Sequence, residues 1–234
     1  MPRFRRGRDE VDDGDLAPGR DGATEAADSR LTNGPWDVQD VDDEVHRLDL
    51  GALHVPVPDG CEVRVDVQDD QAVAATLVDG RSAVQIHAFA APKRSGIWDE
   101  VREEIATSLR TSGGSAEEVD GPFGRELRAR IPVPDAAQGQ HLQPARFIGV
   151  DGPRWFLRGL ITGAASTDPN QAGVLESAFR DVVVVRGGEA MAPRELIPLR
   201  LPREALQQVE AQQAEQQKPT LEMLERGPEI TETR

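Results

Sequence analysis

The side chains best able to catalyse a reaction or to hold a metal are spaced in this sequence for neither task. The four histidines show no HExxH or comparable ligand spacing, and the single cysteine, Cys61, cannot build a cysteine zinc cluster. Glu62 follows Cys61 directly, and an acidic neighbour raises the pKa of a thiol and weakens it as a nucleophile. We therefore expect no catalytic residue, no metal site and no cofactor. The histidines are His46, His54, His87 and His141.

Two cations stand just ahead of a predicted helix, at the end where the helix dipole is positive. The stretch from Pro92 to Gly96 contains Lys93 and Arg94, and Ser95 is the expected N-cap. Each cation is unfavourable at that end by roughly 0.3–1 kcal/mol at low salt. An anion would relieve this conflict, because the free N–H groups of the helix and both side chains would converge on it. We predict an anion- or partner-binding site here; the alternative is an ordinary solvated loop.

Two further residues are candidates for binding. Arg154 stands beside a tryptophan in a turn at 151–155, where it either adds a cation to such a site or takes part in hairpin packing. Trp36 lies in an acidic run at 34–44, and a large apolar side chain in a polar segment usually docks on another surface. The acidic run is itself one candidate occupant of the site predicted above. The alternative is that Trp36 only anchors the chain at the edge of the domain.

Charge is distributed unevenly along the 234 residues, whose formal net charge is −15. Residues 9–45 carry thirteen acids and two arginines, whereas residues 46–203 are nearly balanced. A segment with few apolar residues and a high net charge cannot bury enough surface to offset its ordering entropy. We expect a disordered acidic tail at 1–34, an acidic strap with Trp36 at 35–45, one domain at 46–203, and a mostly disordered or short-helical tail at 204–234.

Composition excludes several classes of protein. No apolar run approaches the ~20 residues that a membrane helix needs. The acidic net charge argues against nucleic-acid binding, because the protein would repel the phosphate backbone. The arginines within residues 3–8 are too few to hold the chain on an anionic membrane without a lipid anchor, so we expect weak contact there at most. What remains is a soluble protein, which we expect in the cytoplasm.

Hydrophobic spacing predicts two runs of strands, each followed by a helix. Alternating apolar residues predict the strands, and turn signals such as Asp79-Gly80 separate them. Apolar residues at helical spacing from Trp98 to Leu109 predict a helix that buries Trp98, and Asp168-Pro169 predicts the start of a second helix. The expected strands span 48–57, 63–67, 73–78, 83–90, 126–133, 145–150 and 155–161. Residues 182–185 are either a further strand or a buried helix end, because periodicity does not distinguish the two.

Strand runs joined by short turns favour an α+β fold, with a mainly antiparallel sheet and two helices packed on it. The order of elements over 48–186 is similar to the PsbP-like fold, an α/β/α sandwich. We therefore expect one α+β domain, either with this three-layer layout or as a two-layer form, between two disordered tails.

Several longer phrases of the sequence identify a resemblance to a bacterial family. They are Gly34 to Asp37, Phe89 to Glu104, Arg146 to Gly159, Phe179 to Gly187, Met191 to Arg194 and Arg226 to Glu232. In these phrases the chain resembles the actinobacterial family called domain of unknown function 3710, over about 36–232. The resemblance implies a domain of the bacterial cytoplasm, and it implies no activity and no catalytic residue.

The sequence favours a cytoplasmic protein-interaction or scaffolding module that binds an unidentified protein partner and has no catalytic signature. The alternative is a binder of a small anionic ligand at the helix start near 92–96, and the third hypothesis is an enzyme with an unrecognised site. An exposed apolar groove would favour the module, and a cleft with perturbed titratable groups would favour the enzyme. The candidate binding residues are Lys93, Arg94, Ser95 and Arg154, with Trp36 as a docking residue.

Overall fold

The computed structural model describes residues 34–69, 71–93, 96–135 and 139–201. The tails for which disorder is predicted, 1–34 and 204–234, lie outside these residues except for Gly34. Within the described residues, the strands are mostly antiparallel and are accompanied by two α-helices. The predicted α+β class is therefore confirmed.

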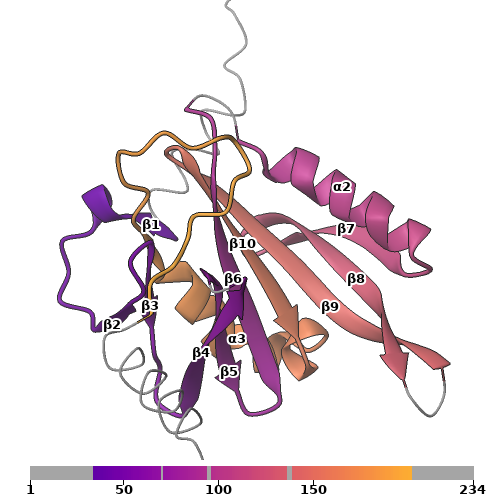
Figure 1. Cartoon of the computed structure of the whole chain (residues 1–234). Helices are drawn as coiled ribbons and strands as arrows, with labels where there is room; N and C mark the ends of the chain where they lie inside the picture. Colours follow the sequence, from indigo (N-terminus) through magenta and orange to yellow (C-terminus); the bar gives the residue numbers. More distant parts are fainter. Residues whose placement is uncertain (1–33, 70, 94–95, 136–138, 202–234) are drawn as a thin grey trace, which may run out of the picture.

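Seven antiparallel strands form the main sheet (Figure 1). In spatial order they are β4 (Cys61–Gln68), β5 (Gln71–Asp79), β6 (Ser82–Ala90), β10 (Trp155–Thr162), β9 (Gly139–Gly152), β8 (Gly124–Asp135) and β7 (Ser115–Gly121). Two meanders, β4 to β6 and β7 to β10, meet where β6 pairs with β10. This junction places Arg158 opposite His87 and Phe156 opposite Phe89, so distant parts of the sequence share one surface.

A smaller sheet packs on one face of the main sheet. Its strands, in spatial order, are β1 (Trp36–Asp37), β11 (Val183–Val184), β3 (Leu53–Pro56) and β2 (Arg47–Asp49). The prediction of one continuous strand at 48–57 is wrong, because the chain reverses between β2 and β3. Gly51 has a φ of 77°, which a residue without a Cβ adopts readily, and the Leu50 N–H donates to the Leu53 carbonyl at 2.9 Å.

Strand β7 is an element that the sequence did not predict. Its sequence carries the acidic residues Glu117, Glu118 and Asp120, and no clear apolar alternation. The strand lies at the edge of the main sheet and pairs only with β8, so it needs no buried face of its own. Acidic side chains on an edge strand also discourage pairing with a further strand.

Two helices, α2 (Trp98–Thr111) and α3 (Pro169–Arg180), pack on opposite faces of the main sheet. Helix α3 begins as predicted: Oδ1 of Asp168 accepts from the Asn170 N–H at 2.9 Å, and Pro169 lies in the first turn. The short 3-10 helices are η1 (Val38–Asp40) and η2 (Ala164–Ser166). No helix in the described ranges is long and apolar enough to cross a membrane.

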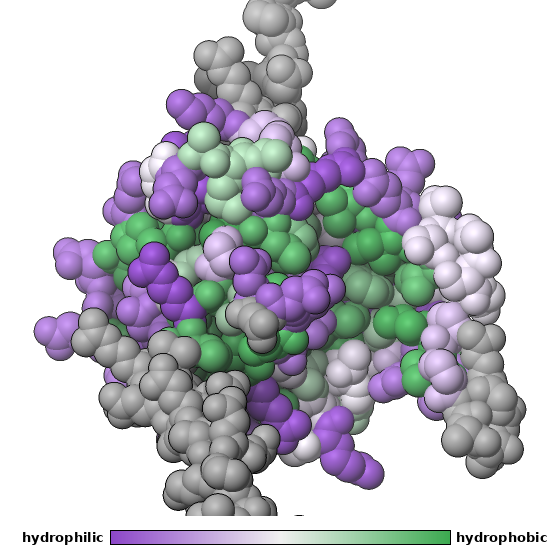
Figure 2. All heavy atoms as spheres, in the orientation of Figure 1, coloured by the Kyte–Doolittle hydropathy of each residue, from purple (hydrophilic) through white to green (hydrophobic). Residues whose placement is uncertain are grey.

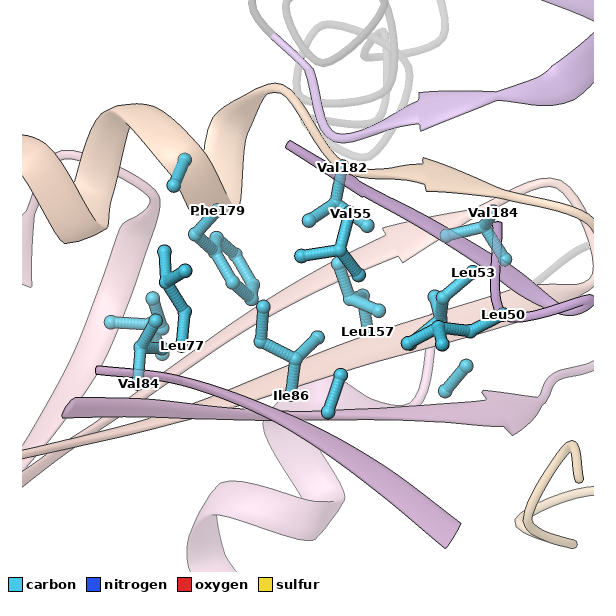
Figure 3. Packing of buried hydrophobic residues seen from close by; sticks show 14 of the residues in the cluster. Leu50, Leu53, Val55, Leu77, Val84, Ile86, Leu157, Phe179, Val182 and Val184 are labelled. Atoms are coloured by element: carbon cyan, nitrogen blue, oxygen red, sulfur yellow. The ribbon is translucent and has the colours of Figure 1, made fainter. Parts of the chain in front are cut away.

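The larger hydrophobic core lies between α3, the small sheet and the main sheet. Figure 3 shows Phe179 pointing from α3 toward Leu77 and Ile86 of the main sheet, with Val55 of β3 beside it. All four side chains are fully buried. Burial of each such side chain stabilises the fold by about 1.5–3 kcal/mol relative to leaving it exposed. The amphipathic patterns of β3, β5, β6 and α3 therefore converge on one core.

A second core lies under α2 on the other face of the main sheet. Trp98 is 5% exposed, which confirms the predicted burial of the first residue of the helical stripe. Its indole Nε1 donates to the Arg125 carbonyl at 2.6 Å, and its ring stacks on Phe156 of β10. Helix α2 is thereby fixed over β7, β8 and β9.

Candidate functional site

Helix α2 covers only part of its face of the main sheet. On β5, β6 and β10 most side chains of the same face are half-buried, as is Asp66 of β4, and of the two described α-helices only α2 packs on this face. Figure 2 shows apolar surface in the middle of the molecule, next to charged side chains. We call this face of β4, β5, β6 and β10 the open face, and its half-buried residues are Asp66, Thr76, Val78, Ala83, Gln85, His87, Phe89, Arg158 and Leu160.

A row of stacked rings runs from the core under α2 out to the open face. The ring of Trp98 lies 5.6 Å from that of Phe156, which lies 5.8 Å from Phe89, and Phe89 lies 6.0 Å from His87. Trp98 and Phe156 are buried, whereas Phe89 and His87 are half-buried. The outer end of this row is therefore a rigid aromatic surface that a partner could contact.

Arg158 lies beside the outer end of the aromatic row. Its guanidinium carbon is 5.3 Å from the centre of the Phe89 ring, and one of its terminal nitrogens is 3.3 Å from Nδ1 of His87. Its Nε is buried and has no hydrogen-bond partner among the described residues. No described carboxylate lies within ion-pair distance of Arg158, and burial lowers the pKa of its guanidinium. Arg158 is therefore a partly buried cation without a counter-ion in the described chain.

His87 is neutral at physiological pH. Burial lowers its pKa to about 4, with a further contribution from the charge of Arg158, while Asp66 acts in the opposite direction. Arginine can only donate hydrogen bonds, so Nδ1 of His87 accepts and the ring proton is on Nε2. The neutral ring is what allows the arginine to stay so close.

We expect the stability of the protein to fall as the pH drops from about 6.5 to about 4, through His87. In the unfolded chain His87 has its ordinary pKa and binds a proton over this range, whereas in the folded protein it does not. The contribution of neutral His87 to the free energy of unfolding is complete above about pH 6.5 and is lost as the pH falls toward 4. Urea unfolding at pH 7.5, 6 and 5 measures this, with His87→Gln as the comparison. Identical pH dependence in the two proteins would contradict the expectation.

Polar side chains border the open face on the side of β4. Asp66 accepts hydrogen bonds from Oγ1 of Thr76 at 2.7 Å and from Nε2 of Gln85 at 2.8 Å. These two bonds hold the carboxylate on the β4–β6 side of the face, away from Arg158 on β10. The open face thus has an acidic end with satisfied hydrogen bonds and a cationic end that lacks a counter-ion.

The helix start predicted as an anion site holds an anion from within the chain. The Ile97 N–H donates to Oδ1 of Asp151 at 2.8 Å, and the Trp98 N–H is 3.2 Å from the same oxygen. Asp151 lies in β9, next to the turn that leads to β10. The helix begins at Trp98 with Ile97 as N-cap, so the predicted N-cap at Ser95 is wrong. The cap comes from a distant strand instead of the preceding loop.

The predicted cations near this helix start are placed only in part. Lys93 is exposed, and Arg94 and Ser95 lie outside the described residues. Arg154 has a φ of 64° and donates from a terminal nitrogen to the Gly187 carbonyl at 2.6 Å. Its own carbonyl accepts from the Ala91 N–H at 2.9 Å. Arg154 therefore joins two loops, and its role in binding an anion stays a prediction.

Trp36 is half-buried in β1, where its N–H donates to the Val182 carbonyl at 2.9 Å. The following residue, Asp37, is 8% exposed and accepts a hydrogen bond from the Trp155 indole at 2.8 Å. Asp43 of the same strap forms an ion pair with Arg47 at 2.7 Å. These contacts fix the strap to the small sheet and to the end of β10, and Trp36 as a partner-docking residue stays a prediction.

The residue types that could do chemistry do not gather in one place. Among the residues that the structure describes, no three His, Cys, Asp or Glu side chains form a group that could hold a metal. Burial and the charge of Asp79 raise the pKa of the Cys61 thiol. The sequence predicted this direction from Glu62, but that carboxylate forms an ion pair with Arg64.

Sequence reasoning missed Arg158, although a signal was present. Arg158 interrupts an apolar strand that lies between two other strands, and a charged residue in such a strand requires a partner or a functional reason. Asp151 was treated only as part of a turn, and no local signal connects it with a helix that begins more than 50 residues earlier in the chain. The contacts of both residues arise only when segments that are distant in the sequence come together in the main sheet.

These features define an α+β domain built on a seven-stranded antiparallel sheet, with a partly uncovered face that carries an arginine without a counter-ion. Comparison with protein-family models matches residues 34–208 to the family described as protein of unknown function, DUF3710, and the chain belongs to this family. The match does not include the predicted similarity at Arg226 to Glu232. None of the curated proteins matches the chain.

Proposed function

We propose that this domain is a non-enzymatic protein-interaction module that binds an acidic segment of a partner protein on the open face. The observation that carries the proposal is Arg158, which is held between Phe89 and His87 without a carboxylate partner among the described residues. An arginine presents a planar fork of donors that matches a carboxylate. A glutamate or aspartate of the partner would complete this contact.

The energetic argument concerns desolvation. A partly buried guanidinium has lost part of its hydration, and its lowered pKa reflects that loss. A carboxylate placed beside it would restore the charge pair that no described carboxylate provides, and such charge-assisted hydrogen bonds are strong. The free protein therefore retains an unfavourable state that an acidic partner relieves.

The aromatic surface supplies the second part of the contact. Phe89 and Leu160 are half-buried apolar residues on both sides of Arg158. Interface centres typically combine aromatic and arginine side chains, which carry a large share of the binding energy. We infer that the partner segment presents an apolar residue next to its acidic one.

The edges of the main sheet are poor sites for a partner strand, which supports binding on the face. Edge strand β4 carries alternating charges, Glu62 and Arg64 among them, and has a β-bulge between Asp66 and Val67. Edge strand β7 is acidic. Charges and bulges of this kind discourage strand addition.

The net charge of −15 would slow the approach of an acidic partner, but most of it belongs to the termini. Residues 46–203 are close to neutral, and charges further than about 8 Å apart are largely screened at physiological salt. Recognition therefore depends on short-range contact with Arg158, and it gains little from long-range steering.

Arg158→Gln should weaken binding of a glutamate-rich peptide that contains one leucine by at least tenfold. NMR titration of the full chain measures the affinity and shows which residues respond, and Arg125→Gln is the control because Arg125 is exposed and far from the open face. A peptide with glutamine in place of glutamate should bind weakly to all proteins. Equal affinity of Arg158→Gln and the wild type, or responses confined to another surface, would contradict the proposal.

The alternative hypotheses remain distinct from this one. A small anion bound by Lys93, Arg94, Ser95 and Arg154 would have to share the helix start with Asp151, which makes it the weaker proposal. The packing of α2 and α3 on opposite faces supports the PsbP-like layout, which stays a prediction. An actinobacterial source and a cytoplasmic location are likewise proposals that follow from the resemblance.

A further inference from the structure

We propose that a cavity on the α3 side of the main sheet binds a small ligand that carries a phosphate-like oxyanion. The cavity has a volume of about 370 Å³ and lies between β7, β8, β9 and the start of α3. It is separate from the open face, which belongs to the opposite side of the sheet. Its polar lining includes Ser115, Glu117, Arg128, Arg130, Arg146 and Thr167.

Two arginines of β8 make this cavity cationic. Arg128 and Arg130 are two residues apart on one strand, so their side chains leave the sheet on the same face. Both line the cavity, both are exposed, and neither has an ion-pair or hydrogen-bond partner among the described residues. Among the other exposed arginines, Arg64 and Arg125 form ion pairs with glutamates. Arg81 and Arg200 also lack a side-chain partner among the described residues, but they do not line the cavity.

The register between β8 and β9 places a third arginine at the cavity. Arg128 is directly opposite Arg146 of β9, and like charges placed opposite each other destabilise a sheet. Arg146 is neutralised by Glu126 and Glu176, which are both within ion-pair distance of its guanidinium. Arg128 and Arg130 are left as the cations available to a ligand.

The hydrogen-bonding groups of the lining fit an oxyanion. Ser115 is opposite Arg130 in the β7–β8 register, and its hydroxyl has no hydrogen-bond partner in the described chain. The start of α3 contributes little, because Asp168 already caps it and Pro169 has no N–H to donate. The site therefore depends on the two arginines and the serine rather than on the helix dipole.

Glu117 sets a limit on the ligand. It is opposite Arg128 in the β7–β8 register and lines the cavity, yet it forms no ion pair with Arg128. A carboxylate at this position would repel an anion that fills the whole cavity. The geometry favours a ligand whose oxyanion group contacts the arginines while an uncharged part lies near Glu117.

The test is calorimetry with the full chain at low salt, with inorganic phosphate, pyrophosphate and citrate as separate probes. We expect at least one probe to bind, and Arg128→Gln/Arg130→Gln to weaken it at least tenfold. The control is Arg64→Gln/Arg125→Gln, which changes the net charge equally at two exposed arginines outside the cavity. Tighter binding of pyrophosphate than of citrate supports a phosphate-like oxyanion as the group that the cavity recognises.

Three results would overturn the proposal. The first is that none of the three probes binds the wild type. The second is that the cavity variant binds as tightly as the wild type, and the third is that the control variant loses as much affinity as the cavity variant. The exposed arginines carry little of the fold's stability, and equal melting temperatures of all variants would verify that each protein is folded. A charge-conserving variant, Arg128→Lys/Arg130→Lys, should bind less tightly than the wild type, because lysine lacks the fork that grips two oxygens.

Discussion

Replacing Trp98 with alanine should lower the free energy of unfolding by about 3–5 kcal/mol, the range for deleting a large buried aromatic side chain. Trp98 is 5% exposed, stacks on Phe156 at 5.6 Å, and donates from its indole to the Arg125 carbonyl. The variant would lose the packing, the ring contact and the hydrogen bond together. Against a typical stability of 5–15 kcal/mol, this loss threatens the fold.

Urea unfolding followed by circular dichroism measures the change, with two comparisons. Val174→Ala, at a side chain that is 45% exposed on α3, should change stability by no more than about 0.5 kcal/mol. Gly149→Ala should also destabilise the protein, because a Cβ at Gly149 would lie 2.4 Å from the Trp98 ring. If Trp98→Ala loses no more free energy of unfolding than Val174→Ala, the proposed packing of α2 is wrong.

Burial of Trp98 was predictable because it depends on spacing within one segment. The stripe from Trp98 to Leu109 has helical period, and any sheet beneath the helix would bury it. The start of the helix was not predictable, because its cap is the carboxylate of Asp151 in another part of the chain. Sequence propensities describe interactions between residues a few positions apart, whereas the contact between Asp151 and the helix start depends on how β9 pairs with its neighbours.

The strands were predicted where alternation is regular and missed where it is not. Strands β4 to β6, β8 and β10 show a repeat of two and lie close to the expected ranges, whereas β9 begins at Gly139, well before the expected start at 145. Strand β7 shows almost none, since an edge strand whose neighbour supplies the hydrogen bonds needs little apolar character. The reversal at Gly51 was missed because apolar residues continue through the turn on both sides.

In the candidate sites, too, the sequence shows the residues but not which of them become neighbours. Arg158 and His87 are both visible in the sequence, but only the pairing of β10 with β6 makes them neighbours. The arginines of the cavity, likewise, face Arg146 and Ser115 only through the β7–β8–β9 register. The predicted cations at 93–94 were identified by a local conflict with the helix dipole, which a distant carboxylate relieves.

Replacing Arg146 with methionine should lower the free energy of unfolding at neutral pH by about 3–5 kcal/mol, the range for breaking a buried ion pair from one side. Arg146 is 6% exposed, and its Nε lies 3.0 Å from Oε2 of the nearly inaccessible Glu126. Glu176 of α3 binds the same guanidinium. Without the cation, two carboxylates would face each other under the helix, and the nearly inaccessible Glu126 would gain little hydration in exchange.

The pH dependence of this loss distinguishes an electrostatic cause from lost packing. Burial raises the pKa of Glu126, and Arg146 opposes this rise, so the raised pKa would increase further in Arg146→Met. A carboxyl group whose folded pKa is raised contributes stability at low pH and loses it as the pH rises through that pKa. The variant should therefore be closer to the wild type at pH 5 than at pH 7.5. Comparing both proteins at each pH cancels the contribution of His87.

A neutral version of the same cluster provides the matched control. Glu126→Gln/Arg146→Met/Glu176→Gln removes all three charges, so it should recover much of the stability lost in Arg146→Met and show no difference between the two pH values beyond that of the wild type. Urea unfolding at pH 5 and 7.5 measures both proteins. A loss in Arg146→Met that is independent of pH, or that the neutral cluster fails to reduce, would mean that Arg146 acts through packing. The charge network under α3 would then have no part in holding the helix on the sheet.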